Sequence, residues 1–264
     1  MKMFYLFKVS IEKSFKEISR YKFNTISSIL SLYFLFIAMF LGVKVFGSTM
    51  DISPIKLGKT IEGFVIGYFL WTIMLMVYED TAFNITRDAN KGTLEQISMT
   101  DLGLPIVLIV RSISNLIINL LICFVVLLTI MGTTNYWLDI NIAELLLIIV
   151  LGVFSIFGIG LICGGLALIF KRIQSLLNVI QYFLIALVIT GQGSLSKVAA
   201  SILPFRPSID KVYATTLMGH KLSEYPASDY IILIVNSIVY FTIGFIVFNQ
   251  CSKIARKRGL LGQY

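Results

Sequence analysis

The side chains best suited to chemistry gather in one charged stretch, residues 79–103, which lies between two apolar runs. Its two leading acids can pair with Arg87 one or two helical turns along, and Gly92 either breaks a turn or lets another backbone approach closely. We expect a short helix parallel to the membrane that contacts a water-soluble partner; the alternative is a charged loop that binds nothing. The candidate contact residues are Glu79, Asp80, Arg87, Gly92, Thr93, Leu94, Glu95 and Gln96.

Other polar residues lie inside apolar runs, where they recur at helical spacing and share one face of a helix. They are Arg111, Asn115 and Asn119, then Gln174, Asn178 and Gln181, with Ser27 and Ser31 at a similar depth of the first run. Polar groups are costly in lipid, so they should face protein or water. They predict either a vestibule that loads a partly polar cargo, or interhelical hydrogen bonds beside an Arg111 whose charged end reaches the interface.

Catalytic chemistry has little support in this sequence. The single histidine, His220, has no second ligand nearby, and Cys123, Cys163 and Cys251 lie far apart without metal or disulfide spacing. An intramembrane enzyme needs reactive groups that converge at membrane depth. We therefore expect no catalytic residue, no metal site and no cofactor bound by this chain.

The composition is that of an integral membrane protein. Of 264 residues 57% are apolar and 14% charged, against about 45–50% and about 25% in soluble proteins. Six segments are long and apolar enough for spanning helices: residues 26–43, 61–78, 104–131, 145–170, 173–190 and 230–248. The small-residue pairs Gly63/Gly67 and Gly160/Gly164 permit close approach of helices.

The net charge of +8 indicates a basic cytoplasmic rim, not a nucleic-acid partner, because the Lys and Arg residues collect on one side of the predicted spans. That side holds fourteen basic residues: Lys2, Lys8, Lys13, Lys16, Arg20, Lys22, Arg87, Lys91, Lys171, Arg172, Lys253, Arg256, Lys257 and Arg258. We expect both termini and residues 79–103 to be cytoplasmic in a multi-pass protein of the cell membrane.

The remaining segments complete a single all-α membrane domain over residues 1–264. Residues 1–23 carry apolar side chains at helical spacing with lysines elsewhere on the wheel, which predicts an amphipathic helix on the cytoplasmic leaflet. In residues 191–229, Pro207-Ser208 can start a helix and the preceding segment can form another that ends near Pro204. We expect an outer re-entrant helical hairpin there.

The stretch "NITRDANKGTLEQISMTDLG" resembles the signature of permease subunits of type-2 ATP-binding-cassette (ABC-2) exporters. The matching positions are Arg87, Gly92, Thr93, Leu94, Glu95, Gln96, Thr100 and Leu102, and Asp101 stands where the family usually has Pro. The resemblance extends to the amphipathic first helix, the six spans, the outer "LPF" at 203–205 and the tail with Gly259, Leu260, Leu261 and Tyr264.

The resemblance implies that residues 79–103 contain a coupling helix, which docks on a separate ATPase subunit carrying ATP and Mg. The chain has no G-x-x-x-x-G-K-[ST] phosphate loop of its own. It implies further a second permease copy or paralogue, whose first and fifth spans meet those of this chain along the path. The cargo would be small or amphipathic, such as a drug, peptide or lipid-like molecule, and would leave the cytoplasm by alternating access. An ATP-independent pore or a structural membrane protein is the alternative.

Overall fold

The computed structural model describes residues 2–49, 54–90, 92–135, 137, 141–170, 173–189 and 196–259, and these residues are almost all helical, with no strand among them. The elements are α1 (Lys2–Arg20), α2 (Lys22–Thr49), α3 (Pro54–Asn90), α4 (Leu94–Ser98), α5 (Gly103–Thr134), α6 (Ile142–Phe170), α7 (Gln174–Ile189), α8 (Lys197–Ile202), α9 (Arg206–Leu217), the 3-10 turn η1 (Leu222–Glu224) and α10 (Ala227–Lys257).

Five helices of the described chain, α2, α3, α5, α6 and α10, are long and apolar enough to cross a membrane. The prediction of an all-helical, multi-pass membrane protein is confirmed at this level. The sixth predicted span, 173–190, corresponds to α7, which has 16 residues. At 1.5 Å per residue that helix covers about 24 Å, less than the hydrocarbon thickness of about 30 Å. A sixth crossing through α7 stays a prediction.

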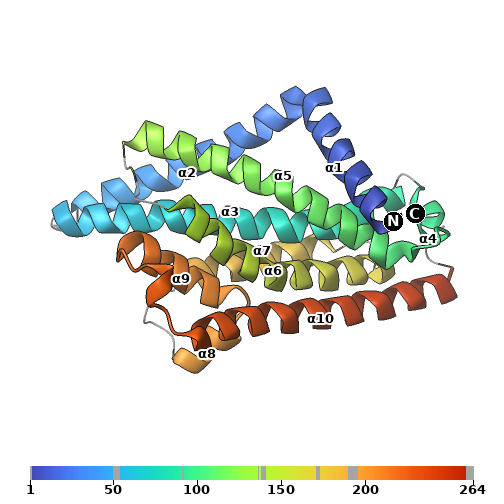
Figure 1. Cartoon of the computed structure of the whole chain (residues 1–264). Coiled ribbons are helices and arrows are strands. Elements are labelled where there is room, and N and C mark those ends of the chain that lie inside the picture. The colour runs from blue at the N-terminus through green and yellow to red at the C-terminus, as the bar shows by residue number, and fades with distance from the viewer. Residues whose placement is uncertain are drawn as a thin grey trace.

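Helix α3 is the centre of the bundle, and α2 lies at its edge (Figure 1). Inside the molecule, 72% of the most apolar window of α3 is buried, against 11% for α2. α3 packs against α2, α5, α6, α7 and α9. A helix that is apolar all round belongs in such an interior position, whereas α2 leaves most of its apolar surface for lipid or for another protein.

The closest helix contact joins α6 and α10 through two glycines. A Cβ atom on Gly158 would overlap the backbone carbonyl of Tyr240, and one on Gly244 would overlap the backbone of Gly158. Small residues permit this approach, and van der Waals packing then holds the helices together in lipid. The predicted pair Gly160 and Gly164 faces α3 instead, where a Cβ would collide with threonine and isoleucine side chains.

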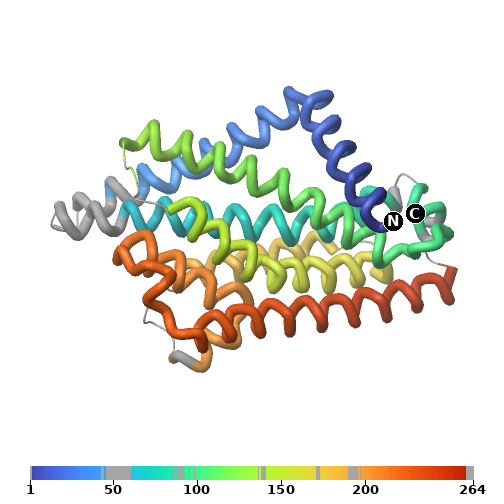
Figure 2. Tube along the Cα trace, in the orientation of Figure 1, coloured from blue at the N-terminus to red at the C-terminus, as the bar shows by residue number. Residues whose placement is uncertain are grey.

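The ends of the bundle differ in what they carry (Figure 1). One end has α1, α4 and the last turn of α10, so the predicted grouping of the basic N-terminal helix, the charged stretch and the tail is present. The tube in Figure 2 follows the chain to this end along α3 and away from it along α5. Residues 260–264 of the tail, with Lys91, Lys171 and Arg172, lie outside the described residues.

The opposite end carries the helical pair α8 and α9 (Figure 1). α8 ends at Ile202 and α9 begins at Arg206, close to the predicted positions, with Phe205 at a φ of 59° in the turn between them. Ile209 and Val212 of α9 are fully buried, and α9 packs against α3, α6, α7 and α10. The two helices are confirmed; their re-entry into a leaflet stays a prediction, and residues 191–195 lie outside the described residues.

The glycine contact gives a stability prediction. Gly158→Ala should lower the free energy of unfolding in detergent by about 1–3 kcal/mol, because an added methyl has no space at the α6–α10 contact. Gly132→Ala in α5 is the matched control, since its Cβ would meet no atom within 4 Å. Equal stability of the two variants in a thermal unfolding experiment would contradict this packing.

Candidate functional site

Two polar ladders on α3 and α5 face each other at the end of the bundle that carries α4. Arg111 donates to both carboxylate oxygens of Asp88, at 2.6 Å from Nη1 and 3.4 Å from Nη2. Two turns back along α3, Asp80 accepts hydrogen bonds of 3.0 and 3.2 Å from the amide of Asn115 and one of 3.0 Å from Asn84. Because α3 and α5 run antiparallel (Figure 1), residues spaced by four on one helix meet residues spaced by four on the other.

Helix α1 joins this network through Ser14, which is half-buried like Leu6, Phe7 and Ile11 of the same helix. The Ser14 hydroxyl donates to the side-chain oxygen of Asn115 at 2.6 Å, and Ser10 is buried. Phe4, Tyr5 and Phe15 of the same helix are exposed. The side of α1 that packs on the protein thus combines two serines with apolar side chains, and several aromatic side chains remain on its open side. The predicted amphipathic segment is helical, and its position on a leaflet stays a prediction.

Asp88 also ends helix α3. Its backbone carbonyl accepts the Thr93 N–H at 3.0 Å and the Thr93 hydroxyl at 3.1 Å, and Gly92 between them has a φ of 66°. This is the left-handed cap that glycine favours after a helix. Leu94, the first residue of α4, is then fully buried. The position of α4 thus follows directly from the end of α3.

The outer surface of α4 is open. Gln96 is exposed, and Met99 just after the helix is 82% exposed, which is unusual for a large apolar side chain beside a charged segment. The side chain of Glu95 lies outside the described part of the structure. Asp101, at the position where the resemblance expected proline, forms an ion pair of 2.7 Å with Lys2. The N-terminus of α1 is therefore attached to the loop that follows α4.

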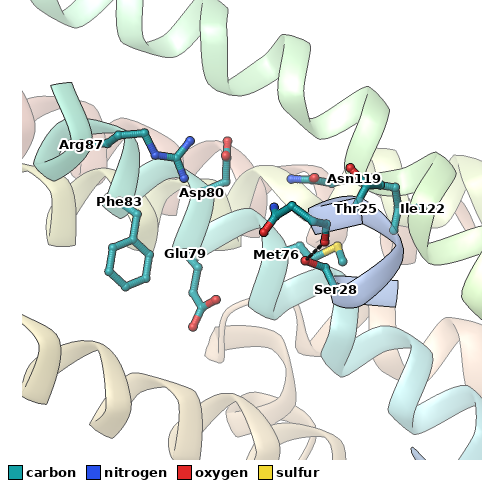
Figure 3. Close-up of a pocket in the computed structure, with 10 residues that line it drawn as sticks. Thr25, Ser28, Met76, Glu79, Asp80, Phe83, Arg87, Asn119 and Ile122 are labelled. Atoms are coloured by element: carbon teal, nitrogen blue, oxygen red, sulfur yellow. Dashed lines mark hydrogen bonds between the residues drawn. The ribbon is translucent and has the colours of Figure 1, made fainter. Parts of the chain in front are cut away.

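A cleft of about 770 Å³ opens beside the ladders, between α2, α3 and α5 (Figure 3). It is lined by Asn24, Thr25, Ser28, Met76, Glu79, Asp80, Phe83, Arg87, Asn119 and Ile122. The Arg87 guanidinium extends toward Asp80, whereas the Glu79 carboxylate points away from both (Figure 3). Within the described chain no ion pair joins Arg87 to either acid, so the predicted pairing is not formed. Polar and apolar groups alternate along this wall.

The structure places the predicted coupling residues in two elements, and not in one short helix. Helix α3 continues to Asn90, so Glu79, Asp80 and Arg87 belong to a spanning helix and its extension, and they line the cleft together with Asn119. Only the segment from Gly92 onward leaves the bundle as a separate short helix. The reason is that the polar residues of α3 find partners on α5, which lets the helix extend beyond its apolar part.

Two predicted groups lie away from the cleft. On α7, Gln174 and Asn178 are exposed and bond to each other at 3.3 Å, and Gln181 is partly buried without lining the cleft. Ser27 and Ser31 are exposed on α2. Asn119 therefore lines the cleft and the α7 group does not, and the vestibule itself stays a prediction.

Sequence reasoning missed several residues that the structure brings into the site: Ser14, Asn24, Asn84 and Asp88. A signal for two of them was present. Asp80, Asn84 and Asp88 are spaced by four, as are Arg111, Asn115 and Asn119, so two complementary stripes predict facing helices. Ser14 had no such signal, because its partner lies about a hundred residues away in the chain.

No family model and no curated protein matches this chain. What the fold and site define is a class: a helical, multi-pass membrane protein with a short exposed helix attached to two of its spans and a polar cleft between three of them. Its function is inferred from these residues and their geometry.

The Asp88–Arg111 pair gives a prediction about stability. Arg111→Gln should cost about 3–5 kcal/mol, because both side chains are largely buried and the Asp88 carboxylate would lose its only bidentate partner among the described residues. Adding Asp88→Asn should restore much of that loss. Lys16→Gln, at the exposed pair with Glu12, is the control and should change stability by less than about 1 kcal/mol. Chemical unfolding in detergent measures these three variants and Asp88→Asn alone, and additive losses in the double variant would refute the pairing.

Proposed function

We propose that this chain is the membrane-spanning permease subunit of an ATP-driven exporter of the ABC-2 type, working with a second permease copy or paralogue. The observation that carries the proposal is an exposed helix, α4, fastened at both ends to spanning helices. α3 enters it through the Asp88 cap and α5 leaves it at Gly103, which has a φ of 72°. The "GTLEQ" sequence of this segment carries the family resemblance.

The mechanism begins at the outer surface of α4. A partner that hydrolyses ATP with Mg grips Gln96 and Met99, which are exposed, and its closure displaces α4. The Thr93–Asp88 cap passes this displacement to α3, and the Asp88–Arg111 pair passes it to α5. Since α3 is the central helix of the bundle, its movement changes the packing of its neighbours. Alternating access needs two alternative arrangements of the spanning helices, and a movement of α3 would interconvert them.

The cargo enters through the cleft between α2, α3 and α5. Its wall combines amide, hydroxyl and charged groups with Met76, Phe83 and Ile122 (Figure 3). Ligand sites of mixed apolar and polar lining bind molecules that are themselves partly apolar. A cleft of about 770 Å³ suits a small or amphipathic molecule. Because α2 is largely unburied, the second permease would complete the wall on that side.

The partner can be captured directly. The three native cysteines are buried, so a single new thiol at Met99→Cys reports on the α4 surface alone. Cross-linking in native membranes should yield an adduct with a nucleotide-binding ATPase. Val198→Cys on α8 should give no such adduct, because it lies at the other end of the bundle although its native side chain is also open, at 71% exposed.

If cross-linking at position 99 captures no ATPase, α4 does not have the coupling role. If the purified chain then formed a stable oligomer that conducts ions unaided, an ATP-independent pore would replace the exporter as the function.

The orientation has its own test. We propose that the end with α4 faces the cytoplasm, because it holds most of the basic residues. A membrane-impermeant maleimide should label Val198→Cys on intact cells and Met99→Cys only after permeabilisation, with at least a tenfold difference in labelling. The reverse order of labelling would place α4 outside the cell and exclude an intracellular ATPase as its partner.

A further inference from the structure

A second cleft, distinct from the cargo cleft, lies beneath helix α1. It has a volume of about 750 Å³ and runs between α1 and the ends of α3, α4 and α5. The charged residues in its wall are Glu12, Lys13, Lys16, Glu17, Arg20, Arg87, Asp88 and Arg111. We name it the α1 groove.

The charge of the groove is positive. Five basic and three acidic side chains line it. Lys16 pairs with Glu12 at 2.7 Å, and its hydrogen bond and charge hold the pKa of the Glu12 carboxyl below its ordinary value. Asp88 is paired with Arg111. Glu12 and Asp88 are therefore already neutralised by Lys16 and Arg111. Five basic against three acidic side chains leave the wall with a net excess of two positive charges.

Two arginines stand out from the rest of the groove. Arg20 stacks loosely on Tyr21, with its guanidinium carbon 6.0 Å from the ring centre. Arg87 is exposed and also lines the cargo cleft on the other side of α3. Neither forms an ion pair in the part of the chain that the structure describes. A guanidinium presents a planar fork of donors that matches the oxygens of a phosphate.

Both arginines directly flank segments that are apolar and long enough to span a membrane. Arg20 lies two residues before the spanning segment Lys22–Gly42 begins, and Arg87 lies two residues after the segment Ile61–Ile85 ends. Both therefore lie at the boundary between hydrocarbon and water, where lipid headgroups are found.

The surface next to Arg20 is apolar and leads into the membrane. Phe23 is 87% exposed, and Ile26, Leu30 and Phe34 continue the exposed apolar surface along α2. A molecule with its anionic group at Arg20 and Arg87 would thus have its apolar part along α2. Inorganic phosphate would use the arginines but not this surface.

We propose that the α1 groove binds an anionic phospholipid, with its phosphate between Arg20 and Arg87 and its acyl chains along the exposed side of α2. Basic pockets between helices at the cytoplasmic side are suited to such headgroups, and arginine–phosphate hydrogen bonds are charge-assisted and strong. The bound lipid bridges α1 to α3 beside the polar ladder. This site requires only that the chain is embedded in a membrane, and it is independent of the exporter function.

Native mass spectrometry of the full chain in detergent tests the site. Phosphatidylglycerol should be retained over phosphatidylcholine of the same acyl chains, and Arg20→Gln or Arg87→Gln should each weaken that retention about tenfold. Arg256→Gln with Lys257→Gln, exposed in the last turn of α10 at the same end of the bundle, is the control pair and should retain the lipid normally.

Three results would overturn the proposal. The groove variants could retain phosphatidylglycerol as well as the native chain does, or the control pair could lose it as much as the groove variants do. Inorganic phosphate or glycerol phosphate could also stabilise the chain as much as phosphatidylglycerol does in a thermal unfolding experiment. The last would assign the arginines to a free anion. Thermal unfolding of each variant in phosphatidylcholine shows whether it has folded, and Arg87→Lys, which keeps the charge, should recover part of the binding.

Discussion

Asp88 is the residue on which the arrangement of this end of the molecule depends, because it acts through two different groups. Its carboxylate pairs with Arg111 and fixes α3 against α5, and its backbone carbonyl accepts two hydrogen bonds from Thr93 and ends α3. Asp88 is buried, and a buried carboxylate is tolerated only with a partner. The interaction that neutralises it therefore also determines where α4 leaves the bundle, and one local constraint places the exposed helix relative to two spans.

The same ladder connects the three regions that function would need. Asn115 binds both Asp80 of α3 and Ser14 of α1, so the interfacial helix, the central span and the cleft share one hydrogen-bonded network. Arg87 lines the cargo cleft on one side of α3 and the α1 groove on the other. A molecule bound in either space would act on the helix that carries α4. Polar contacts within the membrane thus link positions that apolar packing alone would leave independent.

Particular elements show which features the sequence alone predicts. The apolar runs predicted the five long helices, although α3 ends 12 and α10 ends 9 residues beyond the predicted spans, and the patterns of residues 1–23 and 191–229 predicted α1, α8 and α9. The glycine before "TLEQ" correctly marked the break before α4. Glu79, Asp80 and Arg87 were expected in a short helix parallel to the membrane, whereas they continue the helix of the preceding span. Lengths and breaks are local properties, whereas the extension of α3 depends on partners supplied by α5.

Composition, hydropathy and charge distribution determined, without any structure, that the chain is helical, embedded in a membrane and basic at one end, since these follow from the cost of unpaired backbone and charged groups in lipid. Only the tertiary structure decided which polar residues meet. It brought Asn119 to the cleft, left Gln174 and Asn178 on the surface, and turned the serines of α1 inward. Helical spacing tells which side chains share a face of one helix, but the neighbour of that face is set by how all the helices pack together.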